Sequence, residues 1–356
     1  MKKTTTYLAF LLLAFTFYTC SSDTEEALEE ITPVKLSADL TAWPKLSDYH
    51  FFKGDIKNLE PAFGVLPYKP ASELFTDYAL KKRFVWMPKG SKATYDGDGN
   101  ILNFPEKTIL IKNFYYNNVL PDNKTKILET RLLIKINGNW IFAEYIWNDE
   151  QTDAFLNMDG GNINISWMQN GETKSTYYRF PNSIECRVCH INQDKNLPIG
   201  PKPQNLNYNF AYSDGTKNQL QKWIDFGYLE SVPSNINSVV DYKDTSKPID
   251  LRFRSYLDIN CAHCHQDGGD CSYRMVRFPF NQTSDPSKMG VCQDPEEEIP
   301  AHTKIILPGR IDRSVLYYRI STDEQNLMMP KIGRFIVHEE ALQLTEQFIQ
   351  SLSNCN

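Results

Sequence analysis

The sequence predicts an α+β multidomain fold, in which a β-rich N-terminal domain precedes mostly α-helical domains. The chain has 356 residues, more than one hydrophobic core usually holds. From Arg83 to Phe180 the apolar residues recur with a period of two, as in half-buried strands. After Pro181 their period becomes helical. We therefore place the boundary between the two parts near residue 180.

The β-rich domain is expected to span residues 41–180 and to form a sandwich. Aromatic residues make up 13% of the chain, mostly Phe and Tyr, and they suit sheets that pack face to face. Asn137-Gly138 and Asn170-Gly171 are typical of two-residue hairpin turns. The expected strands are residues 83–87, 108–116, 129–137, 140–145, 162–167 and 175–180.

The C-terminal part is expected to comprise a segment 181–240 and a second domain 241–356 with an insertion at 266–302. Amphipathic periodicity predicts helices at residues 218–226, 251–260, 314–320 and 338–352.

Each of these two parts contains one copy of the pattern Cys-x-x-Cys-His, at residues 186–190 and 261–265. Two cysteines three positions apart on one helical turn can bond the two vinyl groups of one haem, and the following His faces the iron. We therefore predict two c-type haems in cytochrome c-like domains. The predicted attachment residues are Cys186, Cys189, Cys261 and Cys264, and the predicted proximal ligands are His190 and His265.

Two other interpretations of the cysteine pairs stay open. The four cysteines could bind one structural zinc ion, or each pair could be a redox-active dithiol. Neither interpretation explains why a His directly follows both pairs.

Met329 is the predicted distal ligand of the second haem. It lies between two expected helices and precedes Pro330, which is where a cytochrome c places its distal thioether. Met328 is the second choice, and core packing is the alternative role for both. The Pro201 carbonyl is the expected acceptor for the N–H of His190, unless Pro201 only stiffens a turn.

The distal ligand of the first haem stays open, because no Met or His lies between His190 and Cys261. An open sixth position is one alternative. The candidate ligands from other segments are Met158, Met168, Met275, Met289, His50, His302 and His338.

The N-terminus is predicted to be a bacterial lipoprotein signal. Lys2 and Lys3 precede a short apolar run, and Cys20 follows at the place of a lipidated cysteine, although residues 17–19 depart from the usual pattern. A plain secretory signal with a chance thiol is the alternative. We expect residues 1–19 to be the signal peptide and 20–40 an acidic tether. The chain would then be exported and lipid-anchored, facing the periplasm or the cell surface.

Export also predicts a disulfide. Cys271 and Cys292 both lie in the insertion, so we expect them to be bonded, which leaves Cys355 free by elimination.

Several runs of the chain resemble a family of exported bacterial dihaem c-type cytochromes, whose members are mostly described as uncharacterised. The runs are residues 45–49 (KLSDY), 129–133 (ETRLL), 147–154 (WNDEQTDA), 260–265 (NCAHCH) and 328–330 (MMP). The resemblance implies a β-rich domain joined to cytochrome c-like haem domains. It also implies a partner, a parallel β-helix repeat protein, and it supplies no substrate.

These observations predict an electron-transfer protein rather than a catalyst. The formal charge of −6 gives no basic stripe for nucleic acid, so redox partner proteins with a neutral or basic face are expected. An enzyme of the dihaem peroxidase type is the alternative if the first haem has an open sixth position. A third interpretation is a binding protein whose β-rich domain recognises a partner or a glycan.

Overall fold

The computed structural model describes residues 31–355, and the residues from Thr32 onward form one compact unit. The predicted signal peptide, Cys20 and the first part of the predicted tether lie outside the described residues. Within residues 31–355 no helix is both long enough and apolar enough to cross a membrane.

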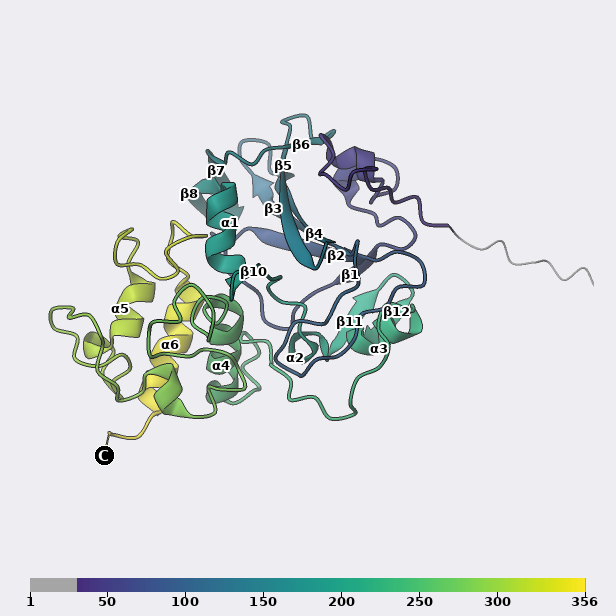
Figure 1. The fold of residues 1–356 in the computed structure, drawn as a ribbon. Coiled ribbons are helices and arrows are strands. Elements are labelled where there is room, and N and C mark those ends of the chain that lie inside the picture. The colour runs from purple at the N-terminus through teal and green to yellow at the C-terminus, as the bar shows by residue number, and fades with distance from the viewer. Residues whose placement is uncertain (1–30, 356) are drawn as a thin grey trace, which may run out of the picture. The chain divides into compact units, whose positions relative to one another are not determined.

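One antiparallel sheet of eight strands dominates the first half of the described chain (Figure 1). Its main path runs β1-β2-β3-β4-β5-β6, and β7 pairs with both β3 and β8. The strands are β1 (Leu66–Tyr68), β2 (Leu80–Trp86), β3 (Ile109–Val119), β4 (Lys124–Ile136), β5 (Asn139–Trp147), β6 (Ala154–Leu156), β7 (Gly161–Gln169) and β8 (Glu172–Phe180).

The six predicted strands are confirmed, but the predicted sandwich is wrong. The β7–β8 hairpin is hydrogen-bonded to β3 at Val119 and Trp167, so the strands belong to one sheet instead of two. The hairpin turns are confirmed as well: Asn137 and Gly138 have φ angles of 51° and 76°, the left-handed region that such turns require. Strands β1 and β6 were missed, because three residues are too few to show a period.

Other segments cover both faces of the sheet. Successive side chains of β2 point to opposite faces, and in the second half of the strand both sets are buried. Phe84 faces the N-terminal coil, where its ring lies 5.3 Å from that of Phe52. The next residue, Val85, faces the opposite side and packs in one cluster with Leu206 and Trp223 from two short helices. A sheet buried on both faces explains why so few of its apolar residues are exposed.

The predicted mostly α-helical, cytochrome c-like architecture of the C-terminal part is wrong. The four predicted helices exist, but loops and turns hold more of residues 181–355 than helices do, and residues 266–302 contain no α-helix. The α-helices are α1 (Ser183–His190), α2 (Pro203–Leu206), α3 (Gln219–Asp225), α4 (Ile249–Asn260), α5 (Val315–Ser321) and α6 (Glu339–Ser351). The short elements are β9 (Ile191–Asn192), β10 (Lys195–Asn196), β11 (Asn209–Tyr212), β12 (Gly215–Asn218), η1 (Leu46–Tyr49), η2 (Ile56–Asn58), η3 (Pro286–Met289) and η4 (Ile311–Arg313).

Helices α4, α5 and α6 share a core of their own (Figure 1). The ring of Phe253 on α4 stacks on that of Phe348 on α6, with ring centroids 4.1 Å apart, and Leu316 on α5 belongs to the same cluster. Because α4 leads directly into Cys261, this core fixes the position of the second Cys-x-x-Cys-His motif.

A buried carboxylate ties the segment before α6 to the segment before β2. The backbone N–H groups of Phe335 and Ile336 donate to Asp77 Oδ1 at 2.7 and 3.0 Å. Next to this contact, the ring of His338 stacks on that of Phe75 at a centroid distance of 4.0 Å. These contacts hold residues 330–335 over the face of the sheet.

The predicted pairing of Cys271 with Cys292 is wrong, because the disulfide joins Cys292 to Cys355. Helix α6 runs back beside residues 306–309, where the N–H of Gly309 donates to the carbonyl of Ile349, and the N–H of Cys292 donates to Ile306. The C-terminus therefore meets the insertion at Cys292. Cys271 is a free, half-buried thiol.

The disulfide is expected to contribute several kcal/mol to stability. For the 63-residue separation, chain entropy gives roughly 4 kcal/mol. The double variant Cys292→Ser/Cys355→Ser should lose about that free energy of unfolding in urea titrations. Cys271→Ser is the matched control and should change it by less than about 1 kcal/mol. Peptide mapping that found Cys271 linked to Cys292 would contradict the pairing.

The buried His338 should make stability sensitive to acid. Burial, with Lys243, Lys81 and Arg334 nearby, lowers the pKa of His338 from 6.5 to about 3. The unfolded chain therefore binds a proton there that the folded chain does not, and stability falls as the pH drops from about 6.5 toward 3.

His338→Phe, which keeps a ring against Phe75, should reduce this dependence. The slope of unfolding free energy against pH should become shallower by up to about 1.4 kcal/mol per pH unit between pH 6 and 4. Urea titrations at several pH values measure the slope. Equal slopes for the two proteins would contradict the inference that the buried His338 ring is neutral in the folded protein.

Candidate functional site

The first motif is presented by helix α1. Asn182 begins the helix with a capping box, in which its side chain accepts from the N–H of Glu185 and the Glu185 carboxylate accepts from the N–H of Asn182. Cys186, Cys189 and His190 follow at positions i, i+3 and i+4, which lie on one face of a helix. Helix α1 therefore points all three side chains the same way.

His190 is held as a metal-binding imidazole would be. Its Nδ1–H donates to the carbonyl of Leu197 at 2.7 Å, which leaves Nε2 free for a metal. Its ring also lies 5.3 Å from that of Phe142. Burial lowers the pKa of His190 to about 4, so the ring is neutral, as a metal ligand must be. The predicted acceptor, Pro201, instead accepts from the N–H of Leu102.

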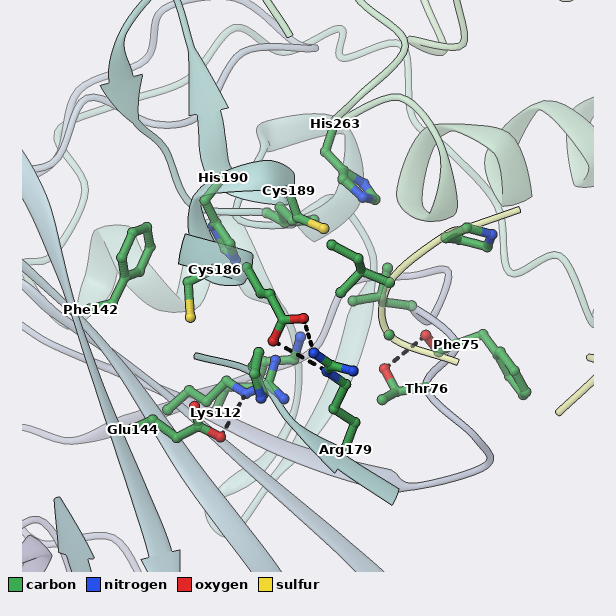
Figure 2. Close-up of a pocket in the computed structure, with 18 of the residues that line it drawn as sticks. Phe75, Thr76, Lys112, Phe142, Glu144, Arg179, Cys186, Cys189, His190 and His263 are labelled. Carbon is green, nitrogen blue, oxygen red and sulfur yellow. Dashed lines mark hydrogen bonds and ion pairs between the residues drawn. The ribbon is translucent and has the colours of Figure 1, made fainter. Parts of the chain in front are cut away.

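A cavity of about 1040 Å³, part of it open to solvent, lies against this face of α1 and is called cavity one here. Cys186, Cys189 and His190 all line it, and Figure 2 shows them around one space with Glu144. The opposite walls come from the sheet and from residues 330–335. The sequence did not predict that the sheet would form a wall of this cavity.

The sheet wall of cavity one carries buried charges. Arg131 on β4 donates to both carboxylate oxygens of Glu129, at 2.9 and 2.6 Å, and the Tyr178 hydroxyl donates to the same carboxylate. Burial and the neighbouring Glu129 carboxylate raise the pKa of Glu144 to about 11. Glu144 is therefore neutral, and Glu129 carries the negative charge that Arg131 balances. Burial also keeps the pKa of Lys112 well below its usual value.

The second motif follows the end of α4. The N–H groups of Cys264 and His265 donate to the carbonyl of Cys261 at 3.2 and 3.0 Å, which forms a tight turn. The side chain of Asn260 anchors this turn by accepting from the N–H of Phe75 at 2.8 Å. Burial lowers the pKa of His265 to about 4, so this imidazole is neutral as well.

A second cavity of about 1290 Å³, part of it open to solvent, adjoins this turn and is called cavity two here. Cys261, Cys264, His265 and Met329 all line it. Met328 does not line it and is 1% exposed in the protein core. The structure thus brings Met329, and not Met328, together with His265, while iron ligation by Met329 stays a prediction.

The two cavities fit the predicted haems in the chemistry of their donors. Each is lined by the two thiols and the neutral imidazole of one motif, and in each most of the lining surface is apolar. In contrast to His190, the buried Nδ1 of His265 has no hydrogen-bond partner within the described protein, so this ring lacks the orienting acceptor that a metal-binding imidazole usually has.

None of the seven candidate distal ligands for the first haem lines cavity one. Met158 accepts from the N–H of Glu144 at 3.4 Å, and His338 stacks on Phe75. Nitrogen donors that sequence reasoning missed do line it, namely Lys112 and His263. His263 belongs to the second motif in the sequence, and only the tertiary structure brings it to cavity one.

The zinc interpretation fits the described residues less well. Cys189, His263 and Cys264 have ligand atoms within 4.8 Å of one another, and residues 31–355 hold no other such group of three. A structural zinc takes four protein ligands, whereas Cys186 and Cys261 lie outside the group. A zinc ion at this place would also leave His190 and His265 without a role.

Comparison with known proteins gives no assignment: no family model, no curated protein and no solved structure matches the chain. The resemblance to dihaem c-type cytochromes therefore stays a prediction.

The assignment of charge beside cavity one predicts that removing two neighbouring carboxyl groups will change the free energy of unfolding by different amounts. Glu129→Gln should lower the free energy of unfolding by roughly 2–4 kcal/mol, because it leaves the Arg131 charge without its partner. Glu144→Gln should change it by less than about 1 kcal/mol, because Gln is also neutral and can donate a hydrogen bond. Urea titrations of both variants measure this. Equal losses would show that Glu144 carries charge.

Proposed function

We propose that this chain is a dihaem c-type cytochrome that transfers single electrons outside the cytoplasm. The observation that carries the proposal is that each of the two Cys-x-x-Cys-His motifs, far apart in sequence, lines its own cavity with both thiols and the imidazole. A zinc site or a dithiol would need no such cavity.

The residues have separate roles in this proposal. Haem iron supplies the one-electron chemistry. Cys186 and Cys189 in cavity one, and the matching pair in cavity two, hold the two groups covalently. Leu197 orients His190 through Nδ1, and Met329 would supply the distal thioether to the haem held by His265. A thioether opposite an imidazole raises the reduction potential and blocks the sixth position, which suits electron transfer.

The partners belong to the same proposal. An acidic chain favours redox partner proteins with a basic or neutral docking face, and the parallel β-helix repeat protein is one candidate. Lipidation at Cys20 would hold the protein at a bacterial membrane, on its periplasmic side or at the cell surface.

Counting haems on the exported protein tests the proposal. The wild-type chain should carry two covalently bound haems, measured by the mass of the denatured chain and by its haem absorption. Cys186→Ser/Cys189→Ser should carry one, and the control Cys271→Ser should carry two. A wild-type chain without covalent haem would overturn the proposal.

Met329 and Met328 form a matched pair for testing the distal ligand. Met329→Leu should abolish the methionine–iron charge-transfer band and lower the reduction potential of one haem, because the thioether is lost. Met328→Leu should keep both, since Met328 is buried in the core. Optical spectra and a redox titration measure the two effects. Loss of the band in Met328→Leu alone would reverse the assignment.

A peroxidase-type activity is the second candidate, and one observation favours it: no methionine lines cavity one. Peroxide reduction would break the O–O bond with two electrons from a partner redox protein and two protons from water, giving two water molecules. Optical and EPR titrations with cyanide and carbon monoxide discriminate the candidates. If both haems stay low-spin and bind neither ligand, the electron-transfer function stands alone.

A further inference from the structure

Cavities one and two share a wall. Cys189, Asn260, His263, Pro330 and Ile332 line both of them. Of the 70 residues between the two Cys-x-x-Cys-His motifs, Asn260 lines both cavities and Ile199 lines cavity one alone. The shared wall is therefore made where the end of α1 meets the turn after α4.

Three ligand-type atoms gather at this wall. The sulfur of Cys189, the sulfur of Cys264 and a ring nitrogen of His263 all lie within 4.8 Å of one another. The Cys264 sulfur also lies 3.6 Å from the carbonyl oxygen of Val188, the residue before Cys189. We call Cys189, His263 and Cys264 the junction.

Backbone contacts next to the junction fix it in place. The N–H of Gln193 donates to the carbonyl of Gly268 at 2.9 Å, and the Asn192 side chain donates to the carbonyl of Asp267 at 2.9 Å. Gly268 has a φ of +77°, and a Cβ atom there would lie 2.7 Å from the Gln193 side chain. A Cβ at Gly269 would lie 2.5 Å from the Cys264 carbonyl oxygen. Glycine at position 268 thus allows the close approach of the two segments, and glycine at position 269 allows the tight turn after Cys264.

The junction determines how close the two bound haems would lie to each other, which neither motif determines alone. In a c-type haem each cysteine sulfur is bonded to the rim of the ring, so two sulfurs within 4.8 Å of each other would place the two rims close together. The same argument removes His263 as the distal ligand of the first haem. A nitrogen within 4.8 Å of the Cys189 sulfur would lie near the rim, whereas a distal ligand must reach the iron at the centre of the ring.

We propose that Cys189, Cys264 and His263 form the contact through which an electron passes between the two haems, so that the haems act as one coupled redox pair. This inference rests on the proposed function. In the transfer, one iron(II) is oxidised to iron(III) and the other iron(III) is reduced to iron(II). No bond is formed or broken and no proton moves. His263 is a positioning residue that packs beside the two sulfurs.

EPR spectroscopy of the holoprotein, with two haems per chain already counted, tests the contact. The fully oxidised protein should show broadened, magnetically interacting haem signals. After reduction of the higher-potential haem, the remaining signal should sharpen to that of a single isolated haem. A fully oxidised spectrum that equals the sum of two isolated signals would overturn the inference while leaving the dihaem proposal intact.

Two glycine variants give a matched comparison. Gly268→Ala places a Cβ against the Gln193 side chain and should separate the two segments, which weakens the magnetic interaction and slows electron exchange after flash reduction of one haem. Gly90→Ala is the control, since Gly90 has nearly the same φ, +78°, but no atom within 4 Å of the added Cβ. Equal interaction in both variants would contradict the role of the junction.

His263→Leu tests the positioning role, with His302→Leu as the control for loss of a histidine elsewhere. His263→Leu should retain two haems per chain but slow the exchange of electrons between them and shift the separation of the two reduction potentials. His302→Leu should change neither. If the two variants behave alike, His263 has no role in the exchange, and only the contact between the sulfurs remains for the EPR experiment to decide.

Discussion

The close contact between the end of α1 and the turn after α4 is the constraint on which the candidate sites depend. Each motif lies at the end of a helix, and each helix is held elsewhere. The capping box at Asn182 holds α1, and the stacking of Phe253 on Phe348 holds α4. The hydrogen bond from Gln193 to Gly268 then joins the two ends. Without that contact there would be two separate cavities with no shared wall.

The sheet has a second role besides forming a core, because it supplies one wall of cavity one. That wall is polar where a protein interior is usually apolar, and its charges are arranged so that only one carboxylate beside Arg131 is ionised. A neutral Glu144 lets the pair of acidic groups stay buried without repulsion. The buried charge balance therefore belongs to the folding of the sheet as much as to the chemistry of the cavity.

Several sequence predictions failed where packing between distant segments decided the structure. The Cys271–Cys292 pairing assumed that cysteines near in sequence would meet, whereas α6 carries Cys355 back to Cys292. The mostly helical architecture was inferred from the helical period after Pro181 and from the resemblance to dihaem cytochromes, but that period determines only separate helices and not the long loops between them. The sequence predicted the Pro201 carbonyl as the acceptor for His190, but the acceptor is Leu197. The partner depends on the path of the loop, which its composition does not determine.

By itself, the sequence determined the local features: the period-two strands, the Asn-Gly hairpin turns, the four longer helices and the two Cys-x-x-Cys-His motifs. Each of these depends on residues a few positions apart, whose preferences act before any tertiary contact forms. Only the tertiary structure decided that β7 and β8 join one sheet, that Met329 and not Met328 faces His265, and that His263 reaches the cavity of the first motif. Those outcomes depend on contacts between segments far apart in the chain, which no local pattern of residues records.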